Sequence, residues 1–272
     1  MIKAIAVDMD GTFLNTQKTY DEERFERIFQ QLKTQQIKFI AASGNQYAKL
    51  KSIFGERAMY FVAENGAVIY EGDKLYDYQT FDRDFYQQVV DYLNIERGIN
   101  NLIVCGLSSA YILKENPESF KKDAHFYYRQ LEEIHSLQHL PEDEYVKIAF
   151  NINRETHPTL DEDLKARFNG KLEFVSSGHD SIDIIIPGVT KGNALKRLLN
   201  TWQLDASELM AFGDANNDLD MLLLAEHSYV MENSEDHSLF EAAKHVAPSN
   251  DKQGVLSCLL YTSPSPRDKR QS

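Results

Sequence analysis

A short apolar run near the start of the chain, Ala4 to Val7, ends in two aspartates, Asp8 and Asp10. Side chains two residues apart in an extended segment share a face, so both carboxylates can converge on one point. Two like charges held that close are unfavourable unless a cation or a shared proton neutralises them. Gly11 then allows the backbone to turn sharply. The pattern indicates a buried strand that ends at a metal or acid–base site, whereas an acidic loop would be the simpler explanation of the pair alone.

A second acidic cluster lies about two hundred residues downstream of the first. Asp214 and Asp218 follow the apolar run Leu209 to Phe212 and precede a helix-like apolar segment. Neighbouring strands of a parallel sheet end at the same edge, so the two clusters can face a common site. Carboxylate oxygens suit a hard cation such as Mg²⁺ better than a soft metal. For Asp218, the alternative is an acid that complements a helix dipole.

The order of apolar segments predicts an α/β protein with an insertion. Strand-like and helix-like segments alternate at both ends of the chain, which is typical of a parallel sheet covered on both faces. From Asp84 to about Pro187 the pattern changes, and the segment Tyr145 to Ile152 indicates an antiparallel sheet with one face in water. We therefore expect a separate α+β domain inserted into a discontinuous core.

The composition of the chain limits the kinds of molecule that we expect it to bind. The formal charge of −13 over 272 residues disfavours nonspecific binding to nucleic acid or to an anionic membrane surface. Cys105 and Cys258 lie far apart in no metal-binding spacing, so no disulfide framework is expected. Met1 leads directly into a strand, and no apolar run is long enough to span a bilayer. These features predict a cytoplasmic protein with no membrane or nucleic-acid partner, and they leave the oligomeric state open.

Four ordered motifs carry a family resemblance that extends from Met1 to about Leu260. They are Asp8 to Thr12, Ser43 and Gly44, Lys191, and Gly213 to Asp218. The chain resembles the haloacid dehalogenase-like superfamily, within it the Cof-type phosphatases, and most closely the bacterial sugar-phosphate phosphatases. This resemblance implies a Rossmann-like parallel-sheet core with an inserted α+β cap. The expected division is core at 1–83 and 188–260, cap at 84–187, and a disordered or non-native tail at 261–272.

The resemblance also implies the catalytic roles of the two N-terminal aspartates. Asp8 would attack phosphorus and form an aspartyl phosphate, which divides one difficult displacement into two easier steps. Asp10 would protonate the leaving oxygen and then deprotonate the hydrolytic water. Mg²⁺ would be held by Asp8, Asp10 and Asp214, with Asp10 contributing its backbone carbonyl, and Asp218 would hold these ligands in place.

The remaining candidate residues would bind the substrate. The phosphate group would be bound by Ser43, Gly44, Lys191 and Asn217. Many relatives carry an arginine where this chain has Asn45, so any substrate charge that this arginine would bind must be met in another way. Possible substrate contacts are Asn45, Gly178 and His179, the last two in a loop of the expected cap.

These observations predict a Mg²⁺-dependent phosphatase of small phosphorylated metabolites, with sugar phosphates as the leading substrate class. A phosphatase for FMN or a flavin precursor is the alternative, because close relatives in the same group are tied to that chemistry. A phosphomutase would share the aspartyl chemistry but would yield an isomer rather than free phosphate. A non-catalytic sugar-phosphate-binding protein would have no need of both Asp8 and Asp10.

Overall fold

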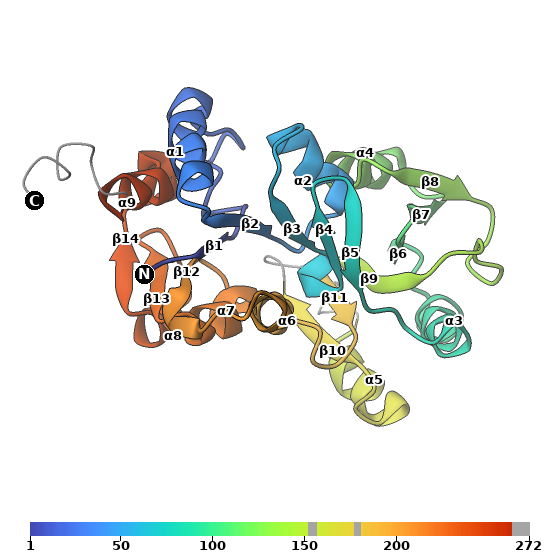
Figure 1. Ribbon diagram of the computed structural model, residues 1–272. Coiled ribbons are helices and arrows are strands. Elements are labelled where there is room, and N and C mark those ends of the chain that lie inside the picture. The colour runs from blue at the N-terminus through green and yellow to red at the C-terminus, as the bar shows by residue number, and fades with distance from the viewer. Residues whose placement is uncertain (152–156, 177–180, 263–272) are drawn as a thin grey trace, which may run out of the picture. The chain divides into compact units, whose positions relative to one another are not determined.

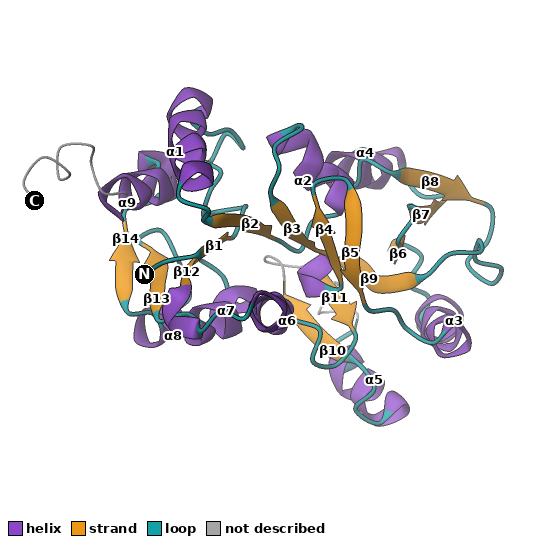
Figure 2. Cartoon of the chain, viewed as in Figure 1, coloured by secondary structure: helices purple, strands orange, loops and turns teal. Residues whose placement is uncertain are grey.

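The computed structural model describes residues 1–151, 157–176 and 181–262. The chain forms two compact units, shown with their elements in Figures 1 and 2. The first unit contains residues 1–43 and 191–272, and the second contains residues 44–190. The expected cap at 84–187 stays a prediction. The expected contacts at Gly178 and His179, and the tail at 263–272, lie outside the described residues.

The first unit is built on five parallel strands in the order β14-β13-β12-β1-β2. Their bounds are β1 (Ala4–Val7), β2 (Lys38–Ala42), β12 (Leu209–Gly213), β13 (His227–Met231) and β14 (His245–Ala247). The two central strands, β1 and β12, are buried along their whole length, as expected for a parallel sheet covered on both faces. The predicted α/β class is confirmed.

Helices connect and cover these strands. They are α1 (Glu22–Thr34), α6 (Lys191–Trp202), α7 (Leu219–Leu224), α8 (His237–Ala242) and α9 (Gly254–Thr262). The Asp21 side chain caps α1 by accepting a hydrogen bond from the Arg24 backbone N–H at 2.9 Å. Apolar residues at helical spacing then bury one face of α1, and α9 lies beside this helix in Figure 1. Within residues 1–151, 157–176 and 181–262, no helix is both long and apolar enough to cross a membrane.

The second unit begins with α2 (Tyr47–Phe54) and an antiparallel meander of β3 (Tyr60–Ala63), β4 (Val68–Glu71) and β5 (Lys74–Tyr78). Gly72 takes a φ of 56° in the turn between β4 and β5, where a side chain would be strained.

The rest of the second unit is a six-stranded sheet with helices. The strand order is β10-β11-β9-β6-β7-β8, antiparallel except between β7 and β8. The strands are β6 (Leu102–Gly106), β7 (Ala110–Leu113), β8 (Leu131–Ile134), β9 (Tyr145–Asn151), β10 (Glu173–Ser176) and β11 (Ser181–Ile185). The helices are α3 (Arg83–Asp91), continued by a π-helical turn (Tyr92–Glu96), α4 (Glu118–Tyr127) and α5 (Leu160–Phe168). Apolar side chains of α3 and α5 share one core cluster with the strands.

The expectation of a water-exposed face on β9 is wrong. Six of its seven residues are buried, including Lys147. This strand lies between β11 and β6, and the ammonium group of Lys147 is paired with carboxylates inside the second unit. A buried ion pair can thus produce the same alternation of polar and apolar residues as a sheet with one face in water.

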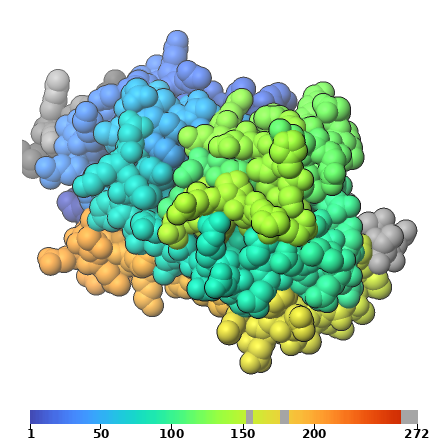
Figure 3. Space-filling model, turned by 90° about the vertical axis from the view of Figure 1, so that its right-hand side faces the viewer, coloured from blue at the N-terminus to red at the C-terminus, as the bar shows by residue number. Residues whose placement is uncertain are grey.

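The connection from β8 to β9 is held against the start of α3. The guanidinium group of Arg83 donates hydrogen bonds to the carbonyl oxygens of Leu140 and Pro141 at 3.0 and 3.1 Å. In the space-filling view of Figure 3 this yellow-green connection lies over the teal surface of the preceding elements. The contacts keep a long loop ordered without a strand or helix of its own.

Candidate active site

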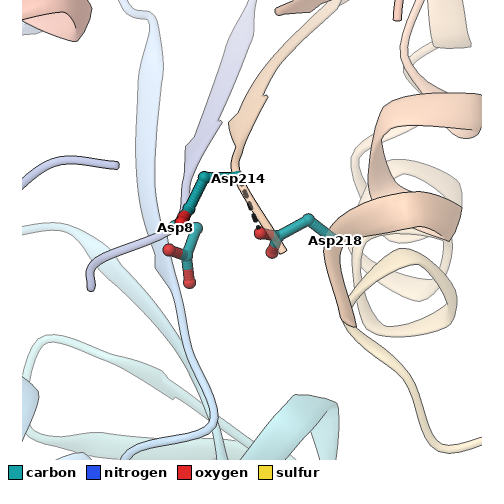
Figure 4. A group of neighbouring side chains, drawn as sticks. All are labelled: Asp8, Asp214 and Asp218. Atoms are coloured by element: carbon teal, nitrogen blue, oxygen red, sulfur yellow. Dashed lines mark hydrogen bonds between the residues drawn. The ribbon is translucent and has the colours of Figure 1, made fainter. Parts of the chain in front are cut away.

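Strand register in the first unit brings the two predicted acidic clusters together. Val7 of β1 pairs with Phe212 of β12, and the Asp8 backbone N–H donates to the Phe212 carbonyl oxygen at 3.0 Å. Asp8 and Asp214 therefore leave adjacent parallel strands at the same edge of the sheet. One carboxylate oxygen from each of Asp8, Asp214 and Asp218 lies within 4.8 Å of the other two. Figure 4 shows the three side chains.

Asp218 supports the loop that carries Asp214. It ends a 3₁₀ turn (Asn216–Asp218) that leads into α7, and it is fully buried. Its Oδ2 accepts hydrogen bonds from the backbone N–H groups of Asp214 and Ala215 at 3.0 and 3.1 Å, the first drawn as a dashed line in Figure 4. A carboxylate that accepts several backbone bonds fixes a loop that would otherwise be free to move.

Lys191 supplies a buried positive charge to this cluster. It is the first residue of α6, and its Nζ lies 2.6 Å from Oδ1 of Asp8 and 2.7 Å from Oδ1 of Asp218. Burial alone would lower the pKa of Lys191, but the charges of Asp218 and Asp8 outweigh burial and raise it. The ammonium group is thus held charged, with its hydrogen bonds directed at two of the three carboxylates.

The carboxylates nevertheless carry an excess of negative charge. Burial, followed by the charge of Asp218, raises the pKa of Asp8 well above its usual range. The same two causes raise the pKa of Asp214 to about 6. One ammonium group therefore does not neutralise three carboxylates, and the cluster favours a proton or a cation.

These residues fit a divalent metal ion. The donors are hard carboxylate oxygens with no sulfur or imidazole among them, which suits Mg²⁺, Ca²⁺ or Mn²⁺ rather than a soft metal. The raised pKa values give a second reason, because a bound cation would stabilise the ionised forms that burial disfavours. The cluster could hold a metal ion, and its donor set does not distinguish among these cations.

Asp10 is placed differently from the other predicted aspartates. Its carboxylate lies 2.7 Å from Nζ of Lys18, and both side chains are about two-fifths exposed. The group of three carboxylates consists of Asp8, Asp214 and Asp218, without the Asp10 side chain. The predicted metal contact of Asp10 through its backbone carbonyl and its acid–base role stay predictions.

The predicted phosphate-binding residues divide between the two units. Ser43 follows β2, whose Ala41 pairs with Val7, so it leaves the same edge of the sheet as Asp8. Asn217 lies in the 3₁₀ turn before α7. Gly44 and Asn45 belong to the second unit. Phosphate binding by these residues stays a prediction.

Sequence reasoning did not identify the residues that hold together the loop after β1 and the loop that carries Asp214. Thr12 Oγ1 donates to Oδ1 of Asp214 at 2.6 Å. Asn233 Nδ2 donates to the Gly11 carbonyl oxygen at 2.8 Å, and Ser234 Oγ donates to the Asp214 carbonyl oxygen at 2.6 Å. Asn233 and Ser234 follow the end of β13, so the signal that identified Asp214, polar residues after an apolar strand, was present for them too.

Comparison with known proteins identifies the family. The family model for haloacid dehalogenase-like hydrolases matches residues 5–259. The chain is 42% identical over 261 residues to the Escherichia coli K12 protein 5-amino-6-(5-phospho-D-ribitylamino)uracil phosphatase YbjI, covering 95% of each chain. It is 27% identical to the Bacillus subtilis protein with the same phosphatase name, YwtE, covering 93% of this chain and 96% of YwtE.

A solved structure shares the fold of this chain. The crystal structure of SMU.1108c from Streptococcus mutans UA159 matches with a TM-score of 0.89 and 32% identity, covering 97% of this chain and 100% of that protein. The predicted family and the prediction of an enzyme are therefore confirmed. The chain belongs to the haloacid dehalogenase-like hydrolase family.

Proposed function

We propose that this protein is a Mg²⁺-dependent phosphatase that hydrolyses a phosphate monoester on a small metabolite through an aspartyl phosphate. The observation that carries the proposal is the cluster of Asp8, Asp214 and Asp218 with the buried Lys191 ammonium group at 2.6 Å from Asp8. Phosphoryl transfer is catalysed mainly by positioning and by stabilising negative charge. A buried carboxylate nucleophile beside an ammonium group and a cation site provides both.

Asp8 is the proposed nucleophile. Its carboxylate oxygen attacks phosphorus in line with the leaving oxygen, so the P–O bond to the metabolite breaks as the aspartyl phosphate forms. Lys191 holds the Asp8 carboxylate in one orientation through its second contact with Asp218. A bound Mg²⁺, held by Asp8, Asp214 and the Asp10 backbone carbonyl, would reduce repulsion between the anionic nucleophile and the anionic phosphate.

Asp10 is the proposed acid and base. It gives a proton to the leaving oxygen and later takes one from the water that hydrolyses the aspartyl phosphate. Its carboxylate is partly exposed beside Lys18, so it is accessible to a substrate oxygen and to water. Ser43, Gly44 and Asn217 are the proposed hydrogen-bond donors to the phosphate oxygens.

We propose a flavin precursor as the first substrate to test. The Escherichia coli relative at 42% identity is named for 5-amino-6-(5-phospho-D-ribitylamino)uracil, whose phosphate lies on a ribityl chain. We therefore propose to test the alternative substrate class from the sequence before the leading class, the sugar phosphates. The two substrate classes share a phosphate on a short polyhydroxylated chain, so the same phosphate-binding residues would serve both.

The test measures release of phosphate with Mg²⁺ and with EDTA. The substrates are the ribitylaminouracil phosphate, FMN, and hexose and pentose phosphates, each followed also for isomer formation. We expect Mg²⁺-dependent release of free phosphate with the highest kcat/KM for the ribitylaminouracil phosphate. A clear preference for a sugar phosphate would change the proposed substrate but not the proposed mechanism. Formation of an isomer without free phosphate would refute the proposal that the protein is a phosphatase.

The nucleophile is tested by Asp8→Asn. We expect turnover to fall by at least about 10³-fold with the fold retained, because the amide cannot form the aspartyl phosphate. The matched control is Asp21→Asn, since Asp21 caps α1 and asparagine caps a helix about as well as aspartate. Wild-type turnover in Asp8→Asn would exclude the covalent mechanism.

A further inference from the structure

The second unit contains a buried ionic cluster of its own, centred on Lys147 of β9. Lys147 Nζ lies 2.7 Å from Oε2 of Glu64 and 3.5 Å from Oδ2 of Asp183. The Asn65 side-chain amide donates to the same oxygen of Asp183 at 2.7 Å. Each of these four residues is at most 3% exposed. Removing each ion from water to form such a network in an apolar interior is unfavourable, so some contribution of the network must offset this free energy.

Stability is a poor reason for this cluster. Oε1 of Glu64 has no hydrogen-bond partner among the described residues, so part of its desolvation is not compensated. Glu64 and Asn65 also take φ angles of 50° and 57°, which are unfavourable for residues with side chains. Apolar residues of similar volume commonly replace buried ion pairs with no loss of stability. The cluster is therefore better explained by what it holds in place.

The cluster holds two successive carbonyl groups of the loop that follows Ser43. Lys147 Nζ donates to the Gly44 carbonyl oxygen at 2.8 Å, and the Glu64 backbone N–H donates to the Asn45 carbonyl oxygen at 3.1 Å. A peptide unit is planar, so fixing the Gly44 carbonyl also fixes the direction of the Asn45 N–H. The loop lies so close to the cluster that a Cβ on Gly44 would be 3.0 Å from Oδ1 of Asn65.

We propose that Lys147, oriented by Glu64 and Asp183, is a positioning residue that fixes the loop Ser43 to Asn45 for binding the substrate phosphate. The inference rests on the proposed function, in which Ser43 and Gly44 bind that phosphate. Lys147 acts through the backbone of the loop and takes no part in bond making. Its loss should therefore weaken phosphate binding more than it slows the chemical steps.

The test compares Lys147→Met with Lys121→Met. Lys121 is a matched control because it lies in the same unit and its Nζ is also 2.7 Å from a carboxylate, that of Glu133. Among the described residues its ion pairs are with Glu133 and Glu118, which lie outside the loop. The measurements are kcat, KM and the inhibition constant of inorganic phosphate, with circular dichroism to monitor folding. For Lys147→Met we expect KM and the inhibition constant to rise about tenfold with kcat nearly unchanged, and no change for Lys121→Met.

The division between KM and kcat separates positioning from a merely structural role. Partial unfolding would lower kcat through the fraction of active enzyme and leave KM unchanged. A folded Lys147→Met protein with both constants within about twofold of wild type would overturn the proposal. If the wild type releases no phosphate from any ester, the proposed function fails first, whereas an active wild type with an unaffected variant refutes only the role of Lys147.

Two further variants keep the test decisive if Lys147→Met does not fold. Lys147→Met/Glu64→Gln removes the ammonium group and one of the two carboxylates, and it keeps Asp183 with its hydrogen bond from Asn65. Asp183→Asn keeps the shape of the side chain and leaves Glu64 to pair with Lys147. We expect a higher inhibition constant for phosphate in the double variant and a smaller increase in Asp183→Asn. Wild-type constants in whichever of these variants folds would contradict the inference.

Discussion

Removing the buried ammonium group from the three-carboxylate cluster should cost far more stability than removing an exposed one at the same distance from a carboxylate. In Lys191→Met, Asp8 and Asp218 lose a fully buried partner at 2.6 and 2.7 Å. Breaking a buried pair on one side typically costs about 3–5 kcal/mol, because the remaining charge stays buried without compensation. The loss is a large part of the roughly 5–15 kcal/mol that stabilises an ordinary domain.

Lys18→Met is the matched control for this prediction. Lys18 Nζ lies 2.7 Å from Oδ1 of Asp10, but both side chains are about two-fifths exposed and screened by water. Exposed ion pairs contribute about 0–1 kcal/mol. For a chain of this size, 1 kcal/mol corresponds to roughly 2–4 °C in the melting temperature, so Lys191→Met should melt about 10 °C lower and Lys18→Met nearly as wild type.

The assay is thermal unfolding followed by circular dichroism at pH 7.5, in EDTA and in Mg²⁺. We expect the full loss for Lys191→Met in EDTA and a smaller loss in Mg²⁺, since a bound cation replaces part of the missing positive charge. Equal losses for the two lysine variants would refute the reasoning. So would a change of less than about 1 kcal/mol in Lys191→Met in EDTA, because the cluster would then be solvated rather than buried.

The pKa of Asp214 is raised to about 6, so the stability of the metal-free protein should depend on pH. The Asp214 carboxyl group favours the folded state while it is protonated, and that contribution to stability is lost as the pH rises through about 6. Mg²⁺ binds the ionised form of Asp214, so the increase in melting temperature that Mg²⁺ produces should be larger at pH 8 than at pH 5. An equal increase at the two pH values would exclude Asp214 as a metal ligand. Gly11 has a φ of +87°, and a Cβ there would overlap the Asp214 carboxylate. Gly11→Ala should therefore weaken Mg²⁺ binding, measured calorimetrically, more than Gly55→Ala, a control that also has a positive φ of 62° but open space around it.

The sequence predicted those parts of the fold whose signals are local. The helix α1 has such signals in its hydrophobic spacing and in its cap at Asp21, and the hairpin of β4 and β5 has one in its glycine turn. Asp8 and Asp214 could be placed together because parallel strands end at one edge. This rule uses only topology, so it needs no knowledge of side-chain packing.

Contacts between distant side chains could not be predicted in the same way. Nothing near Lys147 in the sequence shows that Glu64 and Asp183 neutralise it, so a buried strand position was interpreted as a solvent-facing one. The contact of Asp10 with Lys18 depends on a loop whose course the sequence does not specify. Pairing across many residues is decided by tertiary packing, which overrides local pattern.

The two buried clusters have different capacities for a cation, and their composition explains why. The site in the first unit has three carboxylates within 4.8 Å of one another around one ammonium group, a formal excess of two negative charges. The cluster in the second unit has two carboxylates around one ammonium group, a formal excess of one negative charge, and burial raises the pKa of Glu64. Lys147 also donates a hydrogen bond to the backbone carbonyl oxygen of Gly44, and this contact orients a loop rather than a ligand. The same residue types therefore provide a candidate metal site in one unit and, in the other, a support for the loop that we propose to bind phosphate.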